Sequence, residues 1–255
     1  MKDKRLYILL TILIIAIIGL SLMDPIPQDQ AYHDFADKRK ILGIPNFWDV
    51  MSNLPMLFLG SYGIWFTLRN WSKRPELVAN LIPLFLSFGI LLACFGSAYY
   101  HWAPDNHTLV WDRLPMTLMF MPILSLLIYD FVGKEEGKWT FWIAVPLGIF
   151  SVFYWDYTES IGQGDLRFYA FVQFFPMLIA PFIVWIYYKK VSYLKYIFFI
   201  LGWYIVAKLC EYYDKEIYEF LGFWSGHTIK HLTSSISLVY ILMLMNDWEK
   251  DLIRN

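Results

Sequence analysis

Long runs of apolar side chains recur along the whole of this 255-residue chain. Residues 6–23, 81–98 and 114–131 are examples. An α-helix rises about 1.5 Å per residue, so roughly 20 such residues cross a hydrocarbon core of about 30 Å. With 58% hydrophobic and 17% charged residues, the chain is too apolar for an ordinary soluble domain. The short alternating segments of a membrane strand barrel are not found. The sequence therefore predicts an all-α, polytopic membrane helix bundle.

Eight stretches are long and apolar enough to be membrane-crossing helices, and short connections join them into one bundle. Their expected bounds are about 6–23, 48–68, 78–101, 114–132, 139–155, 167–188, 194–212 and 227–246. The first could be a secretory signal, but Asp24-Pro25 follows it where a small-residue cleavage site would stand. We expect residues 1–30 to form an extra N-terminal transmembrane helix with its outer linker, and residues 31–255 to form a seven-helix core.

The distribution of Lys and Arg sets the expected orientation, because basic residues are retained on the cytoplasmic side of a membrane. With the N-terminus inside, thirteen of them fall on inner segments, beginning with Lys2, and six fall on outer segments. The outer loops are also the acidic ones. We therefore predict that the N-terminus and the C-terminus are both cytoplasmic, and the short loops favour a bacterial inner membrane.

The charge and the cysteines exclude two other classes of protein. The net charge is -1 and no basic block is interleaved with aromatic residues, so no nucleic-acid partner is expected. Cys94 and Cys210 lie inside apolar runs, where we expect them to pack and not to form a disulfide framework or a CxxC metal site. Membrane lipids are the expected surroundings, and nothing in the pattern specifies an oligomeric state.

Ionisable side chains inside membrane helices are costly and commonly mark a functional site. His101 closes the third expected span, while His227 and His231 open the last one and share a helix face. In the expected topology His101 and His227 both lie at the outer level, and His231 lies about 6 Å deeper. Three imidazoles from two helices could then bind one zinc ion and leave a fourth position open, which is the arrangement of a catalytic zinc site.

Two further side chains are placed to assist such a site. Ser97 lies one turn before His101 and could donate to an oxyanion, or it could bond a backbone carbonyl one turn back. Asp112 lies in the expected outer loop and could accept a proton from water as a general base. Asp112 could instead cap the fourth helix, whose first turn is Arg113-Leu114-Pro115, or pair with Arg113.

Three other residues compete with this site or lie beside it. His107, in the same expected loop, ranks second as a ligand because loop residues are less well fixed. His33 follows the first span, and we expect it in a solvated surface helix. Lys230 lies between the two histidines of the last span but faces about 100° away from each, so it could snorkel outward.

Together, Ser97-x-x-x-His101, Asp112 eleven residues on, and His227-x-x-x-His231 resemble the alkaline ceramidase family. That family belongs to a wider superfamily of membrane hydrolases that includes the adiponectin and progestin receptors. Residues 46–53 resemble the start of its first core helix, so the resemblance covers about residues 30–246.

This resemblance implies a seven-helix, ceramidase-like core with zinc held by His101, His227 and His231, and with Ser97 and Asp112 assisting. It also implies cleavage of the amide bond of a ceramide-like or other N-acyl lipid, which releases a fatty acid. Eukaryotic members carry an acidic calcium-binding stretch before the first core helix. No such stretch precedes that helix here, which argues against calcium.

Two other functions are compatible with the same residues. One is a zinc-containing, lipid-sensing protein of the receptor type with little hydrolytic activity, although the few residues after the last span favour the enzyme. The other is a haem or retinal protein. Three histidines near one level suit one small ion better than the two sides of a haem, and Lys230 lies too near the outer interface for retinal. The sequence therefore favours a zinc-dependent amide hydrolase.

Overall fold

The fold is known from a computed structural model that describes residues 4–74 and 76–254. Lys2, counted above among the inner basic residues, lies outside these ranges. Within them the chain consists of helices joined by short loops, and no β-strand occurs there. The predicted all-α class is therefore confirmed.

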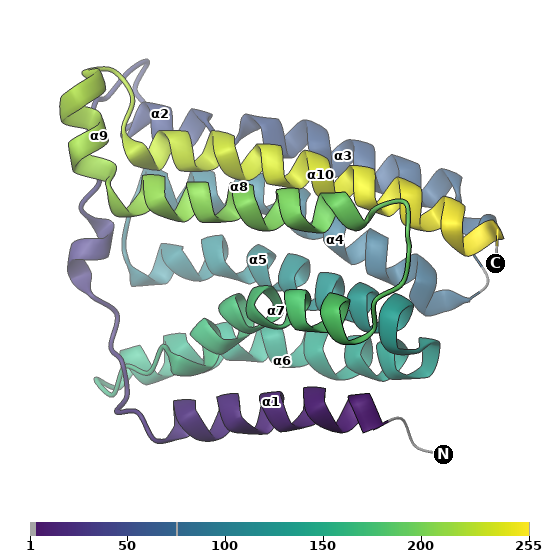
Figure 1. Cartoon of the computed structure of the whole chain (residues 1–255). Helices are drawn as coiled ribbons and strands as arrows, with labels where there is room; N and C mark the ends of the chain where they lie inside the picture. The colour runs from purple at the N-terminus through teal and green to yellow at the C-terminus, as the bar shows by residue number, and fades with distance from the viewer. Residues whose placement is uncertain (1–3, 75, 255) are drawn as a thin grey trace. The chain divides into compact units, whose positions relative to one another are not determined.

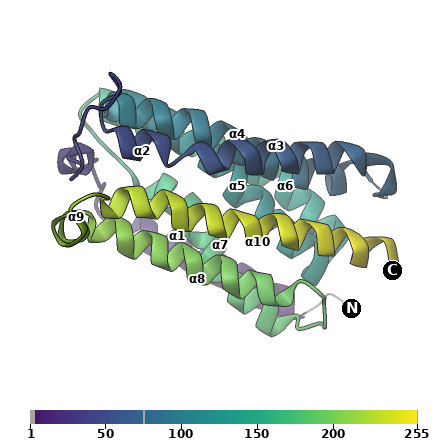
Figure 2. The ribbon, with the colours of Figure 1, turned by 90° about the horizontal axis from the view of Figure 1, so that it is seen from above.

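Contacts divide the described chain into two units, and the first of them holds every predicted site residue. This site unit comprises residues 29–74, 76–116 and 191–254. Its helices are η1 (Gln30–His33), α2 (Phe47–Met51), α3 (Leu54–Arg69), η2 (Trp71–Lys73), α4 (Leu77–Trp102), the first part of α5 (Asn106–Leu127), α8 (Leu194–Tyr212), α9 (Asp214–Leu221) and α10 (Gly226–Arg254). Figures 1 and 2 both show α3 beside α4 and α8 beside α10. The short α9 lies at the end of the unit where α10 begins (Figure 1).

The second unit comprises residues 4–28 and 117–190. It contains α1 (Lys4–Ser21), the rest of α5, the π-helical turn η3 (Ile128–Val132), α6 (Lys134–Ser160) and α7 (Arg167–Ile186). Helix α1 packs on α7, and the Leu166 N–H donates to the Ile26 carbonyl at 2.8 Å. The N-terminal helix thus belongs to a unit that carries no predicted site residue.

Among the described residues, five helical segments are long and apolar enough to cross a membrane. They are α1, α4, α5 together with η3, α7 and α10. This agrees with the predicted polytopic membrane protein. The seven-helix core, the domain boundary after residue 30 and the orientation in the membrane stay predictions.

The predicted span at 48–68 is divided into two helices, α2 and α3, with Ser52 and Asn53 between them. Pro55 lies in the first turn of α3 and has no N–H, so it cannot continue the hydrogen bonding of α2. The break matters because it exposes backbone and side-chain groups at the end of α2 to the neighbouring helices of the site unit.

Candidate metal centre

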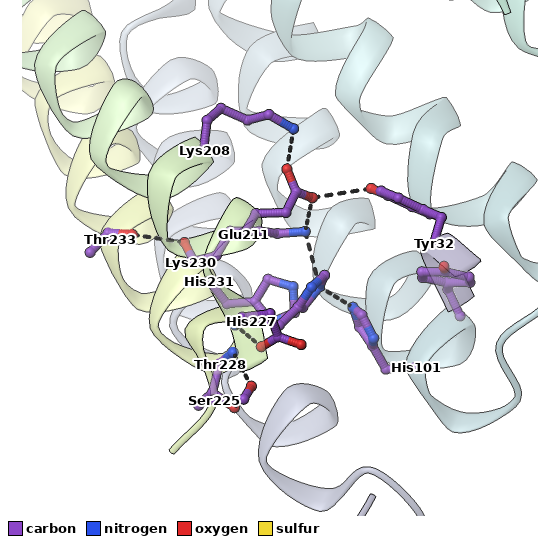
Figure 3. Close-up of polar contacts among 12 residues, drawn as sticks. Tyr32, His101, Lys208, Glu211, Ser225, His227, Thr228, Lys230, His231 and Thr233 are labelled. Carbon is purple, nitrogen blue, oxygen red and sulfur yellow. Dashed lines mark hydrogen bonds and ion pairs between the residues drawn. The ribbon is translucent and has the colours of Figure 1, made fainter. Parts of the chain in front are cut away.

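The first turn of α10 is fixed by two side chains that satisfy its free N–H groups. Asp214 Oδ1 accepts from the His227 N–H at 2.7 Å, and Ser225 Oγ accepts from the Thr228 N–H at 3.1 Å. These caps determine where α10 begins. They therefore also determine the direction in which its two histidines leave the helix (Figure 3).

Three buried imidazoles meet between the end of α4 and the start of α10. The Nε2 atoms of His101 and His227 are 3.2 Å apart, and ring nitrogens of His101, His227 and His231 all lie within 4.8 Å of one another. Two nitrogen ligands of a tetrahedral zinc ion, each at about 2.0–2.1 Å, would be about 3.3 Å apart. The three residues are 0%, 3% and 3% exposed. A buried three-histidine group that could hold a metal ion is therefore present, at the residues that the sequence indicated.

Ser97 and Asp112 also come together, because α4 and α5 approach very closely. The Ser97 hydroxyl lies next to the Asp112 carboxylate, and both residues are buried. A Cβ atom added to Gly96 would lie 1.9 Å from the Trp111 carbonyl oxygen, so only glycine permits this approach. Ser97 lies one turn before His101 on α4. Ser97 and Asp112 therefore share one region of the site unit with the histidines.

Asp112 lies in the second turn of a helix and not in a loop, because α5 begins at Asn106. Asp105 supplies the cap of that helix, since its Oδ1 accepts from the Thr108 N–H at 2.7 Å. The same hydrogen bond lowers the pKa of the Asp105 carboxyl. The predictions that Asp112 belongs to a loop or caps the fourth helix are therefore wrong, and the residue is free for another role.

Lys230 is largely buried and faces a carboxylate. Its Nζ donates to Glu211 Oε1 at 2.9 Å and lies 3.0 Å from His227 Nε2. Glu211 also pairs with Lys208 and accepts from the Tyr32 hydroxyl at 3.1 Å, as Figure 3 shows. The prediction that Lys230 snorkels outward is wrong, because Glu211 on α8 offers a buried partner. Sequence reasoning missed Glu211. It could have been found as a carboxylate inside an apolar helix, where an ionisable group commonly marks a function.

Phe35, in the segment of residues 29–39, packs against two of the three histidines. The Phe35 ring is 4% exposed, and its centroid lies 4.6 Å from those of His101 and of His227. Burial, reinforced by the nearby Glu211 carboxylate, raises the pKa of the Tyr32 hydroxyl well above its usual value. Tyr32 therefore stays a neutral hydrogen-bond donor to that carboxylate.

The two remaining histidines lie apart from the three-histidine group. His33 ends η1 and is half-buried, with Nδ1 2.9 Å from the Tyr100 hydroxyl and Nε2 2.9 Å from Asn106 Oδ1. Our prediction of a solvated surface helix for His33 is wrong, because these two partners hold it against α4 and α5. His107 is exposed in the first turn of α5 and is not a member of the group.

Helix α2 and the residue that follows it supply two site residues that sequence reasoning missed. The buried Asp49 carboxylate accepts from the Thr228 hydroxyl at 2.6 Å and from the Ser225 hydroxyl at 3.2 Å, which joins α2 to the start of α10. Ser52 Oγ lies 2.8 Å from His231 Nδ1. A carboxylate in an apolar span is a sequence signal that could have found Asp49.

A scan of the chain against protein-family models finds no family that matches, and a search of curated proteins finds no significant match. A functional assignment for this chain therefore depends on its residues and their geometry.

Proposed function

We propose that this chain is a zinc-dependent membrane hydrolase that cleaves the amide bond of a ceramide-like or other N-acyl lipid and releases a fatty acid. The observation that carries the proposal is a buried three-histidine group, with a neighbouring carboxylate and serine, among helices apolar enough to cross a membrane. Metal ligands, a carboxylate that accepts protons and a hydroxyl donor are the parts that amide hydrolysis uses. The resemblance to alkaline ceramidases supports the same chemistry.

His101, His227 and His231 would hold the metal ion. Imidazole nitrogen suits zinc, and the 3.2 Å between two of the Nε2 atoms fits two ligands of one tetrahedral ion. Three protein ligands leave one position open, as in catalytic zinc sites. When bound, zinc supplies a Lewis acid that polarises a carbonyl and activates water near neutral pH.

Asp112 is the proposed general base and acid. Its carboxylate accepts a proton from the attacking water, and it returns that proton to the amide nitrogen as the C–N bond breaks. The Ser97 hydroxyl, which lies next to this carboxylate, would help to hold it in place. The same hydroxyl stabilises the oxyanion that develops on the carbonyl if it turns toward the substrate.

The surroundings of the histidines favour a substrate with long acyl chains. Phe35 packs against the His101 and His227 rings, and the helices around them are apolar. We propose that the lipid enters sideways from the bilayer. In the proposed orientation the site lies near the extracytoplasmic face, and both termini are cytoplasmic.

The test is to purify the full chain in detergent, measure its metal content and assay fatty-acid release from a panel of N-acyl lipids. We expect bound zinc and release from long-chain amides in the wild type. His231→Ala should lose both, while Asp112→Asn should keep the metal and lose the release. If His231→Ala keeps its zinc and its activity, the ligand assignment is wrong. Zinc without fatty-acid release from any lipid of the panel would favour the lipid-sensing alternative.

A further inference from the structure

The early end of α2 leaves a backbone carbonyl open to side chains. In a continuous α-helix the Asp49 carbonyl would accept from the Asn53 N–H. Here that N–H bonds a carbonyl three residues back at 3.4 Å, and Pro55 prevents the helix from continuing. The Asp49 carbonyl instead accepts from Asn53 Nδ2 at 2.8 Å and from Ser52 Oγ at 3.2 Å.

Side-chain hydrogen bonds hold this helix end against the histidine-bearing helix. The Asp49 carboxylate accepts from the hydroxyls of Ser225 and Thr228, and all three residues are buried. Because α2 is fixed there, the Ser52 hydroxyl reaches the ring of His231, with 2.8 Å between Oγ and Nδ1. Ser52 and His231 are buried as well, so water does not compete for this contact.

The Ser52 hydroxyl carries one proton and has two neighbours, the Asp49 carbonyl at 3.2 Å and His231 Nδ1 at 2.8 Å. A carbonyl oxygen can only accept, whereas Nδ1 donates in one tautomer of the ring. The arrangement in which both contacts are hydrogen bonds therefore has Ser52 donating to the Asp49 carbonyl and accepting from His231 Nδ1–H. A neutral imidazole carries one N–H, so Nε2 of His231 keeps its lone pair. His101 Nδ1, by contrast, is buried without a hydrogen-bond partner among the described residues.

We propose that Ser52 is a positioning residue for the metal centre. Its hydroxyl, backed by the Asp49 carbonyl, holds the His231 ring in the orientation and tautomer that present Nε2 to a metal ion. The inference rests on the metal centre of the proposed function and is independent of the substrate. Removing the hydrogen-bond partner of a ligating histidine typically weakens metal affinity roughly 10- to 100-fold.

The first experiment titrates Co²⁺ alone into the detergent-purified full chain and follows the visible absorption of the bound ion. Ser52→Ala should weaken Co²⁺ binding roughly 10- to 100-fold and alter the spectrum, and Ser52→Thr should restore both because it keeps the hydroxyl. Ser235→Ala is the matched control, since Ser235 is also buried and its Oγ donates to the His231 backbone carbonyl at 2.8 Å without touching the ring. If Ser52→Ala binds Co²⁺ as Ser235→Ala does, the inference is overturned and the metal centre stands.

The second experiment reads the tautomer directly in metal-free protein labelled with ¹⁵N-histidine. The chain has five histidines, so single substitutions assign their ring signals. Wild-type His231 should show a protonated Nδ1 and an unprotonated Nε2, and Ser52→Ala should show a mixture. An unchanged tautomer would overturn the role of Ser52 even if the variant were less stable. A wild type that binds no Co²⁺ would overturn the metal centre and this role with it.

Discussion

The Nε2 atoms of His101 and His227 lie 3.2 Å apart, although 126 residues separate the two histidines in the sequence. Both rings are buried away from bulk solvent, and Lys230 Nζ lies 3.0 Å from the His227 nitrogen. A hydrogen bond between His101 Nε2 and His227 Nε2 would join only two of the three rings. A metal ion could bind a nitrogen of all three histidines. Metal binding should therefore stabilise the end of α4 against the start of α10.

Removal of the metal should lower the thermal stability of the chain. A ligand that binds only the folded state contributes about 2.7 kcal/mol when its free concentration is 100 times Kd. We expect a chelator to lower Tm and added Zn²⁺ to restore it in the wild type, as measured by a thermal melt in detergent. His231→Ala should show no response to Zn²⁺, whereas the exposed His107→Ala should respond like the wild type. A zinc-dependent Tm in His231→Ala would contradict the assignment.

Lys230 and Lys208 should contribute unequally to stability, although both pair with Glu211. The Lys230 side chain is 16% exposed and that of Lys208 is 37% exposed. Breaking a fully buried pair costs about 3–5 kcal/mol, whereas exposed pairs contribute less than about 1 kcal/mol. We expect Lys230→Met to lower the free energy of unfolding more than Lys208→Met does. Because the Lys230 side chain is not fully buried, its loss should be smaller than the cost of breaking a fully buried pair. Equal losses in metal-free unfolding experiments would refute this ordering.

The histidines and Ser97 could be predicted because their geometry is local or follows from topology. Residues four apart share a helix face, and His101 and His227 stand at the ends of helices that run in opposite directions. Asp112 was assigned to the loop before α5 because the predicted start of that helix was too late, and the true start depends on the Asp105 side chain and not on hydropathy.

The partners of the site were not predictable in this way. Ser52 contacts a histidine 179 residues away, and Glu211 on α8 pairs with Lys230 on α10. Both contacts depend on how separate helices pack, and hydropathy and helical spacing do not specify that packing. The break between α2 and α3 is different, because Pro55 marks it in the sequence.

The cap of α5 should weaken in acid. The folded-state pKa of Asp105 is lowered by the Thr108 N–H, so its contribution is present above the unfolded carboxyl pKa of about 3.9 and is lost as the pH falls through the lower folded value. Hydrogen exchange in the first turn of α5 should therefore speed up as the pH falls below about 4, after correction for the intrinsic rate. Asp105→Asn keeps an acceptor and should lose this pH response. The same acid response in the Asn variant would show that another group controls it.

Gly96→Ala should separate α4 from α5 and remove the contact between Ser97 and Asp112. The added Cβ would meet the Trp111 carbonyl oxygen at 1.9 Å, and a backbone atom cannot turn away as a side chain can. Under the proposed mechanism the loss of a positioned general base lowers the rate of fatty-acid release by roughly 100-fold or more. Gly202→Ala is the control, because a Cβ on Gly202 of α8 would meet nothing within 4 Å. Zinc content should stay near the wild-type level in both variants, since neither change removes a histidine. Wild-type release by Gly96→Ala would mean that the close approach of α4 and α5 is not needed for the reaction.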